Sequence, residues 1–132
     1  MNADDLPENR LTEQILGAAI EVHKALGPGL LESAYESCLA FEFGLRQIEV
    51  DRQKALPVRY KNHLVESGFR VDLLIAGLVV VELKAVEKLL PIHQAQILTY
   101  LKLTGCRVGL LLNFNVKRLK DGGIQRFAQG LL

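Results

Sequence analysis

The sequence predicts a mixed α/β fold with a layer of two helices, a three-strand antiparallel meander, a crossover helix and a parallel fourth strand. Two observations lead to this prediction. Apolar residues recur every three or four positions through residues 11–45 and again over 91–104, as in helices with one buried face. Alternating or unbroken apolar runs bounded by turn residues occupy 48–86 and 107–114, which is typical of strands.

The first part of the chain is helical. Residues 11–26 place Ile15, Ala19 and Val22 on one face, and the glycine-rich turn at residues 27–29 ends this helix. A second helix follows over about residues 30–45, and a glycine at position 44 weakens its last turn. We expect these two helices to form one layer.

Three strands of a meander come next. Residues 48–60 alternate apolar and charged side chains but contain Pro57, so they predict an interrupted or edge strand. A tight turn at 61–62 leads to a long strand over 63–75, and a turn near Gly77 leads to a third strand over 78–86.

The last third predicts a crossover. Pro91 suits the first turn of a helix, and Gly105 suits a C-terminal cap, so residues 91–104 form the third helix. Residues 107–114 contain an apolar run typical of a strand buried on both faces, and a strand, helix, strand order implies a parallel crossover. After a turn at 121–123, the element around 124–127 is too short to assign.

Length and composition indicate a single domain spanning residues 1–132. The 132 residues are 49% hydrophobic and 23% charged, as in ordinary globular proteins. No apolar run approaches the roughly 20 residues that span a bilayer, and residues 1–5 are acidic where a secretory signal is basic. We therefore expect a cytoplasmic protein with no membrane partner, and we expect Cys38 and Cys106 to be small core residues without a disulfide.

A charged cluster at the end of an apolar strand is the first candidate for chemistry. Val79, Val80 and Val81 lead directly into Glu82, and Lys84 shares a strand face with Glu82 because strand side chains alternate. Buried charges need a partner or a metal. Together with Asp72 on the preceding strand, Glu82 offers the oxygen ligands that Mg²⁺ or Mn²⁺ prefers, and Lys84 could position the attacking water in metal-assisted phosphodiester hydrolysis. The alternative is a Glu82–Lys84 ion pair with Asp72 unrelated.

The loop between these two strands decides whether the two acids meet. A two-residue loop, Ala76-Gly77, sets Asp72 opposite Val81 and on the wrong face. A three-residue loop or a bulge sets Asp72 opposite Glu82. The metal-site interpretation requires the second arrangement.

The helices supply further polar candidates. His93, Gln96 and Tyr100 form one stripe on the third helix. Gln96 and Tyr100 could contact a phosphate or the attacking water, or else cap buried backbone groups or lie in solvent. Glu32 and Tyr35 share a face at the start of the second helix, where Glu32 could provide a third carboxylate for the metal. His23 is expected to be a hydrogen-bonded packing residue rather than a ligand.

Residues 29–35 read G-x-x-E-x-x-Y. Together with Val22-His23, the turn at 27–29, the D…ExK pair and Gln96…Tyr100, they closely resemble the GxxExxY protein family over nearly the whole chain. That family belongs by pattern to the PD-(D/E)XK nuclease superfamily, so the resemblance implies a restriction-endonuclease-like core. It also implies that Asp72 and Glu82 are metal ligands, Lys84 the catalytic lysine, Glu32 the acid from the N-terminal helices, and Gln96 and Tyr100 assisting residues. Val71 stands where the superfamily name has proline.

These observations lead to two functional hypotheses. The first is a small Mg²⁺- or Mn²⁺-dependent nuclease acting on DNA or RNA. The alternative is a catalytically silent nuclease-fold module that binds nucleic acid or a protein partner. The net charge of +1 neither indicates nor excludes a nucleic-acid partner. A homodimer is plausible, because a chain of this size offers little surface to hold a duplex.

Overall fold

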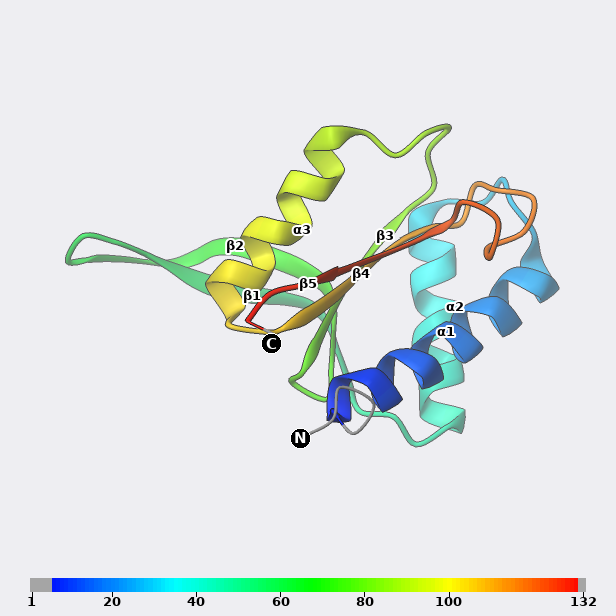
Figure 1. Ribbon diagram of the computed structural model, residues 1–132, viewed down its shortest axis with the longest axis horizontal. Coiled ribbons are helices and arrows are strands. Elements are labelled where there is room, and N and C mark those ends of the chain that lie inside the picture. Colours follow the sequence, from blue (N-terminus) through cyan, green and yellow to red (C-terminus); the bar gives the residue numbers. More distant parts are fainter. Residues whose placement is uncertain (1–5, 131–132) are drawn as a thin grey trace.

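One five-stranded mixed sheet carries the fold of the described residues, 6–130, in the computed structural model. The elements in chain order are α1 (Pro7–Leu26), α2 (Glu32–Leu45), β1 (Val50–Tyr60), β2 (His63–Ile75), β3 (Val79–Lys84), α3 (Pro91–Thr104), β4 (Val108–Asn113) and β5 (Ile124–Ala128). The strand order is β1-β2-β3-β4-β5, and β3 pairs with β4 in parallel while the other neighbours are antiparallel. The predicted meander, crossover helix and parallel fourth strand are therefore confirmed (Figure 1).

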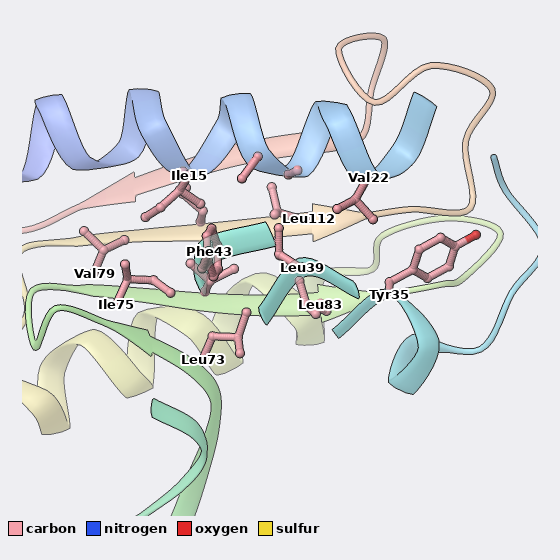
Figure 2. Close-up of a cluster of buried hydrophobic side chains, with 14 of the residues drawn as sticks. Ile15, Val22, Tyr35, Leu39, Phe43, Leu73, Ile75, Val79, Leu83 and Leu112 are labelled. Carbon is pink, nitrogen blue, oxygen red and sulfur yellow. The ribbon is translucent and has the colours of Figure 1, made fainter. Parts of the chain in front are cut away.

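Helices cover both faces of this sheet (Figure 1). On one face, side chains of α1 and α2 pack against alternate residues of β2, β3 and β4 in the larger hydrophobic cluster (Figure 2). On the other face, α3 contributes Ile97 and Leu101 to a smaller cluster with Val80 and Leu111. Because β3 and β4 lie between these layers, both strands are buried along almost their full length. This explains why their sequences are nearly continuous apolar runs.

Several predicted boundaries differ from the structure. The first helix begins at Pro7, four residues before the predicted start, because a proline fits the first turn of a helix. The second begins at Glu32 rather than at residue 30, and β3 is limited to Val79–Lys84 instead of 78–86. The untyped segment near the C-terminus forms β5, which pairs with β4. Gly105 caps α3 in the left-handed conformation, as predicted.

The edge strand β1 accommodates its proline at an irregularity. The ladder with β2 pairs Leu56 with Phe69 and then Val58 with Val65, so β2 has extra residues opposite Pro57. A proline lacks the amide hydrogen that a central strand needs, and an edge bulge tolerates this loss. The predicted edge strand is therefore confirmed, and it continues through Pro57.

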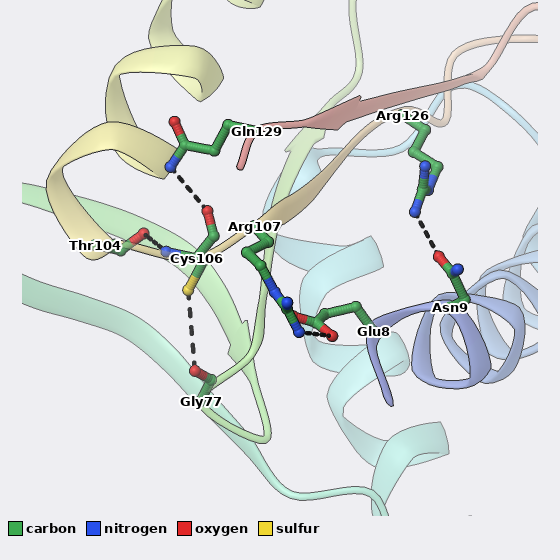
Figure 3. Close-up of polar contacts among 8 residues, drawn as sticks. All are labelled: Glu8, Asn9, Gly77, Thr104, Cys106, Arg107, Arg126 and Gln129. Atoms are coloured by element: carbon green, nitrogen blue, oxygen red, sulfur yellow. Dashed lines mark hydrogen bonds and ion pairs between the residues drawn. The ribbon is translucent and has the colours of Figure 1, made fainter. Parts of the chain in front are cut away.

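The start of α1 is tied to the far edge of the sheet (Figure 3). The buried Glu8 carboxylate accepts hydrogen bonds from Arg107 Nε at 2.7 Å and Nη2 at 2.8 Å. Arg126 of β5 donates a 2.6 Å hydrogen bond to Asn9. These contacts join residues about a hundred positions apart and hold α1 across the sheet.

The cysteine prediction is wrong for one of the two thiols. Both cysteines are free, but Cys38 is exposed whereas Cys106 is buried, as expected. Cys38 lies on α2 next to the core residue Leu39, and residues one position apart on a helix point in different directions. No helix in residues 6–130 is long and apolar enough to cross a membrane.

Candidate active site

The turn between β2 and β3 has three residues. Ile75 pairs with Val79, Leu74 with Val80 and Leu73 with Val81, so Ala76, Gly77 and Leu78 form the loop. Ala76 and Gly77 both have positive φ angles, 52° and 68°. This odd loop continues the register so that Asp72 lies opposite Glu82, which is the arrangement that the metal-site interpretation requires.

Asp72 and Glu82 are joined by crossed hydrogen bonds between side chain and backbone. The Asp72 amide donates to Glu82 Oε2 at 2.7 Å, and the Leu83 amide donates to Asp72 Oδ2 at 2.8 Å. The regular β2–β3 ladder ends at the Leu73–Val81 pair, and these two contacts extend the connection between the strands by one further position. One oxygen of each carboxylate is thereby fixed, and the two acids are held side by side.

Burial makes the Glu82 carboxyl a weaker acid than usual. Its residue is 3% exposed, and desolvation, followed by the negative charge of Asp72, raises the pKa of Glu82 to about 8. The charge of Lys84 acts in the opposite direction, and the charge of Glu32 adds a smaller upward contribution to the pKa of Glu82. At neutral pH and without a compensating cation, the Glu82 carboxyl is therefore mostly protonated.

Lys84 is the last residue of β3, and it is half-buried. The ion pairs among residues 6–130 are Arg46–Glu42, Arg52–Glu36, Arg107–Glu8 and Arg118–Asp121. The Glu82–Lys84 ion pair considered from the sequence is thus not formed. The charge of Lys84 nevertheless acts on the Glu82 carboxyl, whose pKa it lowers.

The start of α2 is positioned by Tyr35. Its hydroxyl donates to the Gly27 carbonyl at 2.6 Å and accepts a hydrogen bond from the Leu30 amide at 3.1 Å. Its ring is fully buried and stacks on Phe114 with centroids 4.6 Å apart. Tyr35 therefore fixes the loop that precedes α2 and the position of Glu32, the first residue of that helix.

A cleft connects the start of α2 with the strands. It is lined by Glu32, Ser33, Glu36, Gln53, Asp72 and Leu83. Glu32 is exposed and shares this cleft with Asp72. The second helix and the D…ExK strands thus face one common space, which the linear sequence could only suggest.

Gln96 and Tyr100 of α3 approach the same carboxylates. Gln96 Nε2 donates a 2.9 Å hydrogen bond to the Tyr100 hydroxyl. Burial, followed by the charge of Glu82 and with a smaller contribution from Asp72, raises the pKa of Tyr100, while the Gln96 hydrogen bond lowers it. The charges of both carboxylates therefore act on the Tyr100 hydroxyl.

Two histidines among the candidates have structural contacts. His93 Nδ1 accepts a hydrogen bond from the Leu90 amide at 3.0 Å, which caps the first turn of α3. His23 is 4% exposed, and its Nε2 lies 3.0 Å from the Phe114 carbonyl. His23 thus takes the packing position that its sequence context predicts.

Three polar residues near the site were not singled out from the sequence. Gln53 Nε2 donates hydrogen bonds to Glu36 Oε1 and, at 3.3 Å, to Asp72 Oδ1, so it links α2 to β2. Asn113 Oδ1 accepts from the Val86 amide at 3.1 Å and its amide nitrogen donates to the Val86 carbonyl at 2.9 Å. Asn113 closes an apolar strand as Glu82 does, and this pattern could have identified it. No local signal could identify Gln53 or Glu36.

Comparison with known proteins identifies a related family. A family model described as the PD-(D/E)XK nuclease superfamily matches residues 9–127. The chain belongs to this superfamily. The matched range begins within α1 and ends within β5, and the elements follow the order expected of a restriction-endonuclease-like fold. Neither the curated proteins nor the solved structures contain a significant match.

Divalent metals are general cofactors of PD-(D/E)XK nucleases, and the two carboxylates fit such an ion. Within residues 6–130, no three Asp, Glu, His or Cys side chains are arranged as a metal site. Asp72 and Glu82 still suit an ion such as Mg²⁺, which often takes one or two carboxylates and keeps several waters. Burial and the charge of Asp72 both disfavour ionised Glu82, and a bound cation would offset these two effects.

Proposed function

We propose that this PD-(D/E)XK domain is a divalent-metal-dependent nuclease that hydrolyses phosphodiester bonds of nucleic acid. The observation that carries the proposal is the joining of Asp72 and Glu82 across a three-residue loop, with Lys84 one strand step beyond Glu82. In this proposal Asp72 and Glu82 hold Mg²⁺ or Mn²⁺, and Glu32 contributes through water from the start of α2.

A divalent ion in this position would polarise a phosphoryl oxygen and lower the pKa of bound water. The Lys84 ammonium orients the attacking water and offsets negative charge that develops on the phosphoryl group. Tyr100 accepts the hydrogen bond from Gln96, so its own hydroxyl proton is free to be donated to a phosphoryl oxygen. Water then attacks phosphorus and releases a proton to solvent, the ester P–O bond breaks, and the leaving oxygen takes up a proton from solvent.

The proposal extends to features that follow from the G-x-x-E-x-x-Y resemblance and from the size of the chain. We assign the chain to the GxxExxY group, with residues 1–132 as one domain acting in the cytoplasm. The motif is supported by its structural use: Tyr35 fixes the loop that presents Glu32. A homodimer would supply the additional surface that a 132-residue nuclease needs to hold a duplex.

A catalytically silent nuclease-fold module is the second candidate, and one observation favours it. Each of the two carboxylates accepts a backbone hydrogen bond, so Asp72 and Glu82 also join β2 to β3. In such a module the acids would be kept as structural elements, and the domain would bind nucleic acid or a protein partner without cleaving it.

Cleavage assays with matched variants distinguish the two candidates. The purified chain is incubated with single- and double-stranded DNA and RNA in Mg²⁺, Mn²⁺ or EDTA. Lys84→Ala is compared with Lys88→Ala, and Glu82→Gln with Glu87→Gln. Lys88 and Glu87 are exposed in the loop after β3, so they are matched controls close to the site.

The nuclease proposal predicts metal-dependent cleavage that Lys84→Ala reduces by at least about 100-fold, in the range found when one group that stabilises transition-state charge is removed. Both loop controls should cleave like the wild type. Equal activity of Lys84→Ala and wild type would refute the assigned mechanism. If folded wild type cleaves none of the four substrates in either metal, the silent module becomes the better description.

A further inference from the structure

The hairpin formed by β1 and β2 extends well beyond the helices. Figure 1 shows it projecting from the sheet on the side away from α1 and α2. Within residues 54–70, which we call the arm, every residue is exposed except Leu56, Val58 and Phe69, which are half-buried. The arm therefore adds little to either hydrophobic cluster, and the fold of the core does not explain its length.

The arm concentrates positive charge. It contains Lys54, Arg59, Lys61 and Arg70 and a single acid, Glu66, so its formal charge is +3. The whole chain has a formal net charge of +1, which leaves the remainder net negative. None of the four cations forms an ion pair with another described residue. The near-neutral total thus conceals a local basic surface.

These cations lie on both faces of the ribbon. Lys54 pairs with Val71, and the next rung pairs Ala55 with Arg70. Side chains on successive rungs point to opposite faces, so Lys54 and Arg70 project in opposite directions. A ribbon placed in a groove between two phosphate walls needs cations on both faces.

The dimensions of the arm also suit a nucleic-acid duplex. Eight residues separate Arg70 from Asn62 in the turn at the tip, which at about 3.3 Å per residue gives a reach of about 26 Å. This corresponds to about eight phosphate spacings along one strand of a duplex. A two-stranded β-ribbon fits the major groove of B-form DNA, which is about 12 Å wide.

The arm begins at the candidate active site. Arg52 and Gln53 immediately precede it on β1 and contact Glu36, while Asp72 follows it on β2. A duplex held along the arm would therefore lie next to the cleft that contains Asp72.

We infer that residues 54–70 form a basic arm that binds the phosphate backbone of a nucleic-acid duplex and leads it to the Asp72–Glu82 cleft. The inference rests on the proposed function for the class of ligand, but binding by the arm requires no cleavage. Pairing with a second copy of the chain is the competing use of an exposed hairpin. Lys54, Pro57 and Arg59 on the edge strand oppose it, because lysine and proline on an edge disfavour strand pairing between molecules.

Binding measured in EDTA tests the arm separately from catalysis. The probe is a fluorescent 20-base-pair DNA or RNA duplex, and affinity is followed by anisotropy across a salt series. The arm variant is Lys54→Gln/Arg59→Gln/Lys61→Gln. The first control exchanges the same residues for the other basic type, Lys54→Arg/Arg59→Lys/Lys61→Arg.

A second control removes three exposed cations outside the arm, Arg10→Gln/Lys24→Gln/Lys120→Gln. Circular dichroism and thermal unfolding verify that every variant folds. The arm variant should bind about 100-fold more weakly at about 0.1 M salt, and its salt slope should fall by about three, one for each cation that no longer neutralises a phosphate. The charge-keeping control should bind like the wild type, and the second control should lose much less affinity.

Unchanged affinity of the arm variant, or an equal loss in the second control, would overturn the inference. A wild-type dimer that becomes a monomer in the arm variant, measured by light scattering, would assign the arm to self-association and would also overturn it. Duplex binding without cleavage in Mg²⁺ or Mn²⁺ would leave the arm supported and refute only the nuclease proposal.

Discussion

The Asp72 amide donates a 2.7 Å hydrogen bond to the Glu82 carboxylate. This contact holds two acidic side chains together at the end of a buried strand, where Glu82 is 3% exposed. The pair therefore has two properties that can be measured without a substrate: its effect on stability as pH changes, and its response to a divalent ion.

Glu82→Gln should change how stability depends on pH. Burial and Asp72 raise the pKa of Glu82 from 4.5 to about 8 in the folded protein. Between these values the folded state holds a proton that the unfolded state has lost, so the metal-free wild type loses stability as pH rises from about 5 to about 8. At one pKa unit per 1.36 kcal/mol, the loss is on the order of 4 kcal/mol. Urea unfolding in EDTA at pH 5, 7 and 9 measures it.

In that experiment Glu82→Gln should show a much smaller decline than the wild type. Glu87→Gln, which changes an exposed acid, should follow the wild type. A wild-type free energy of unfolding that is flat from pH 5 to pH 9 would contradict the assigned acidity of Glu82.

Binding of Mn²⁺ should release a proton. At pH 6.5 a Glu82 carboxyl with a pKa of about 8 is mostly protonated, and a metal ligand must be deprotonated. We expect about one proton released per ion at pH 6.5 and almost none at pH 9.5. Calorimetry in buffers of different ionisation enthalpy measures this number. Asp72→Asn should abolish binding, whereas tight binding without proton release at pH 6.5 would exclude Glu82 as a ligand.

Tyr35→Phe should destabilise the protein by about 1–2 kcal/mol. The substitution keeps the ring that stacks on Phe114 but removes the hydrogen bonds to Gly27 and Leu30. Tyr60→Phe is the matched control because Tyr60 is 64% exposed, and it should change stability by less than about 0.5 kcal/mol. Chemical denaturation compares the two, and equal stability of both variants would show that Tyr35 does not fix the loop before α2.

Glu8→Gln should weaken the protein at neutral pH and have less effect in acid. The hydrogen bond from Arg107 lowers the pKa of Glu8, although burial opposes this shift. A lowered pKa in the folded state stabilises the protein above about pH 4.5, and this stabilisation disappears as pH falls through the folded-state pKa. Thermal unfolding from pH 3 to pH 7 should show a difference in Tm that closes toward pH 3. Glu13→Gln, on the exposed side of α1, should show no such trend.

Local patterns predicted most of the elements. The helices, the edge strand with Pro57 and the crossover through α3 were all predicted, because hydrophobic period and turn residues depend on short stretches of chain. Local patterns define the ends of elements less well than their middles, so the start of α1 was predicted four residues too late. Cys38 was assigned to the core because it lies inside an apolar pattern, but the packed face of α2 passes through Tyr35, Leu39 and Phe43 instead.

The candidate site was predicted in its residue types but not in its connections. The functional roles of Asp72, Glu82, Lys84, Glu32, Gln96 and Tyr100 remain predictions. Glu32 and Asp72 line one cleft, and the charges of Asp72, Lys84 and Glu32 all act on Glu82. Gln53 and Glu36 were missed because their contact joins residues 17 positions apart on different elements. Such a contact leaves no period or motif in the sequence.

The order of the elements and the residue types at the ends of the buried strands follow from local hydrophobic pattern. The face on which Asp72 lies depends instead on how the elements pack. Loops of two and three residues at Gly77 both fit the local turn chemistry, but the register that pairs Ile75 with Val79 buries both side chains beneath α1 and α2. Burial of that core selected the three-residue loop, and the loop in turn set Asp72 beside Glu82.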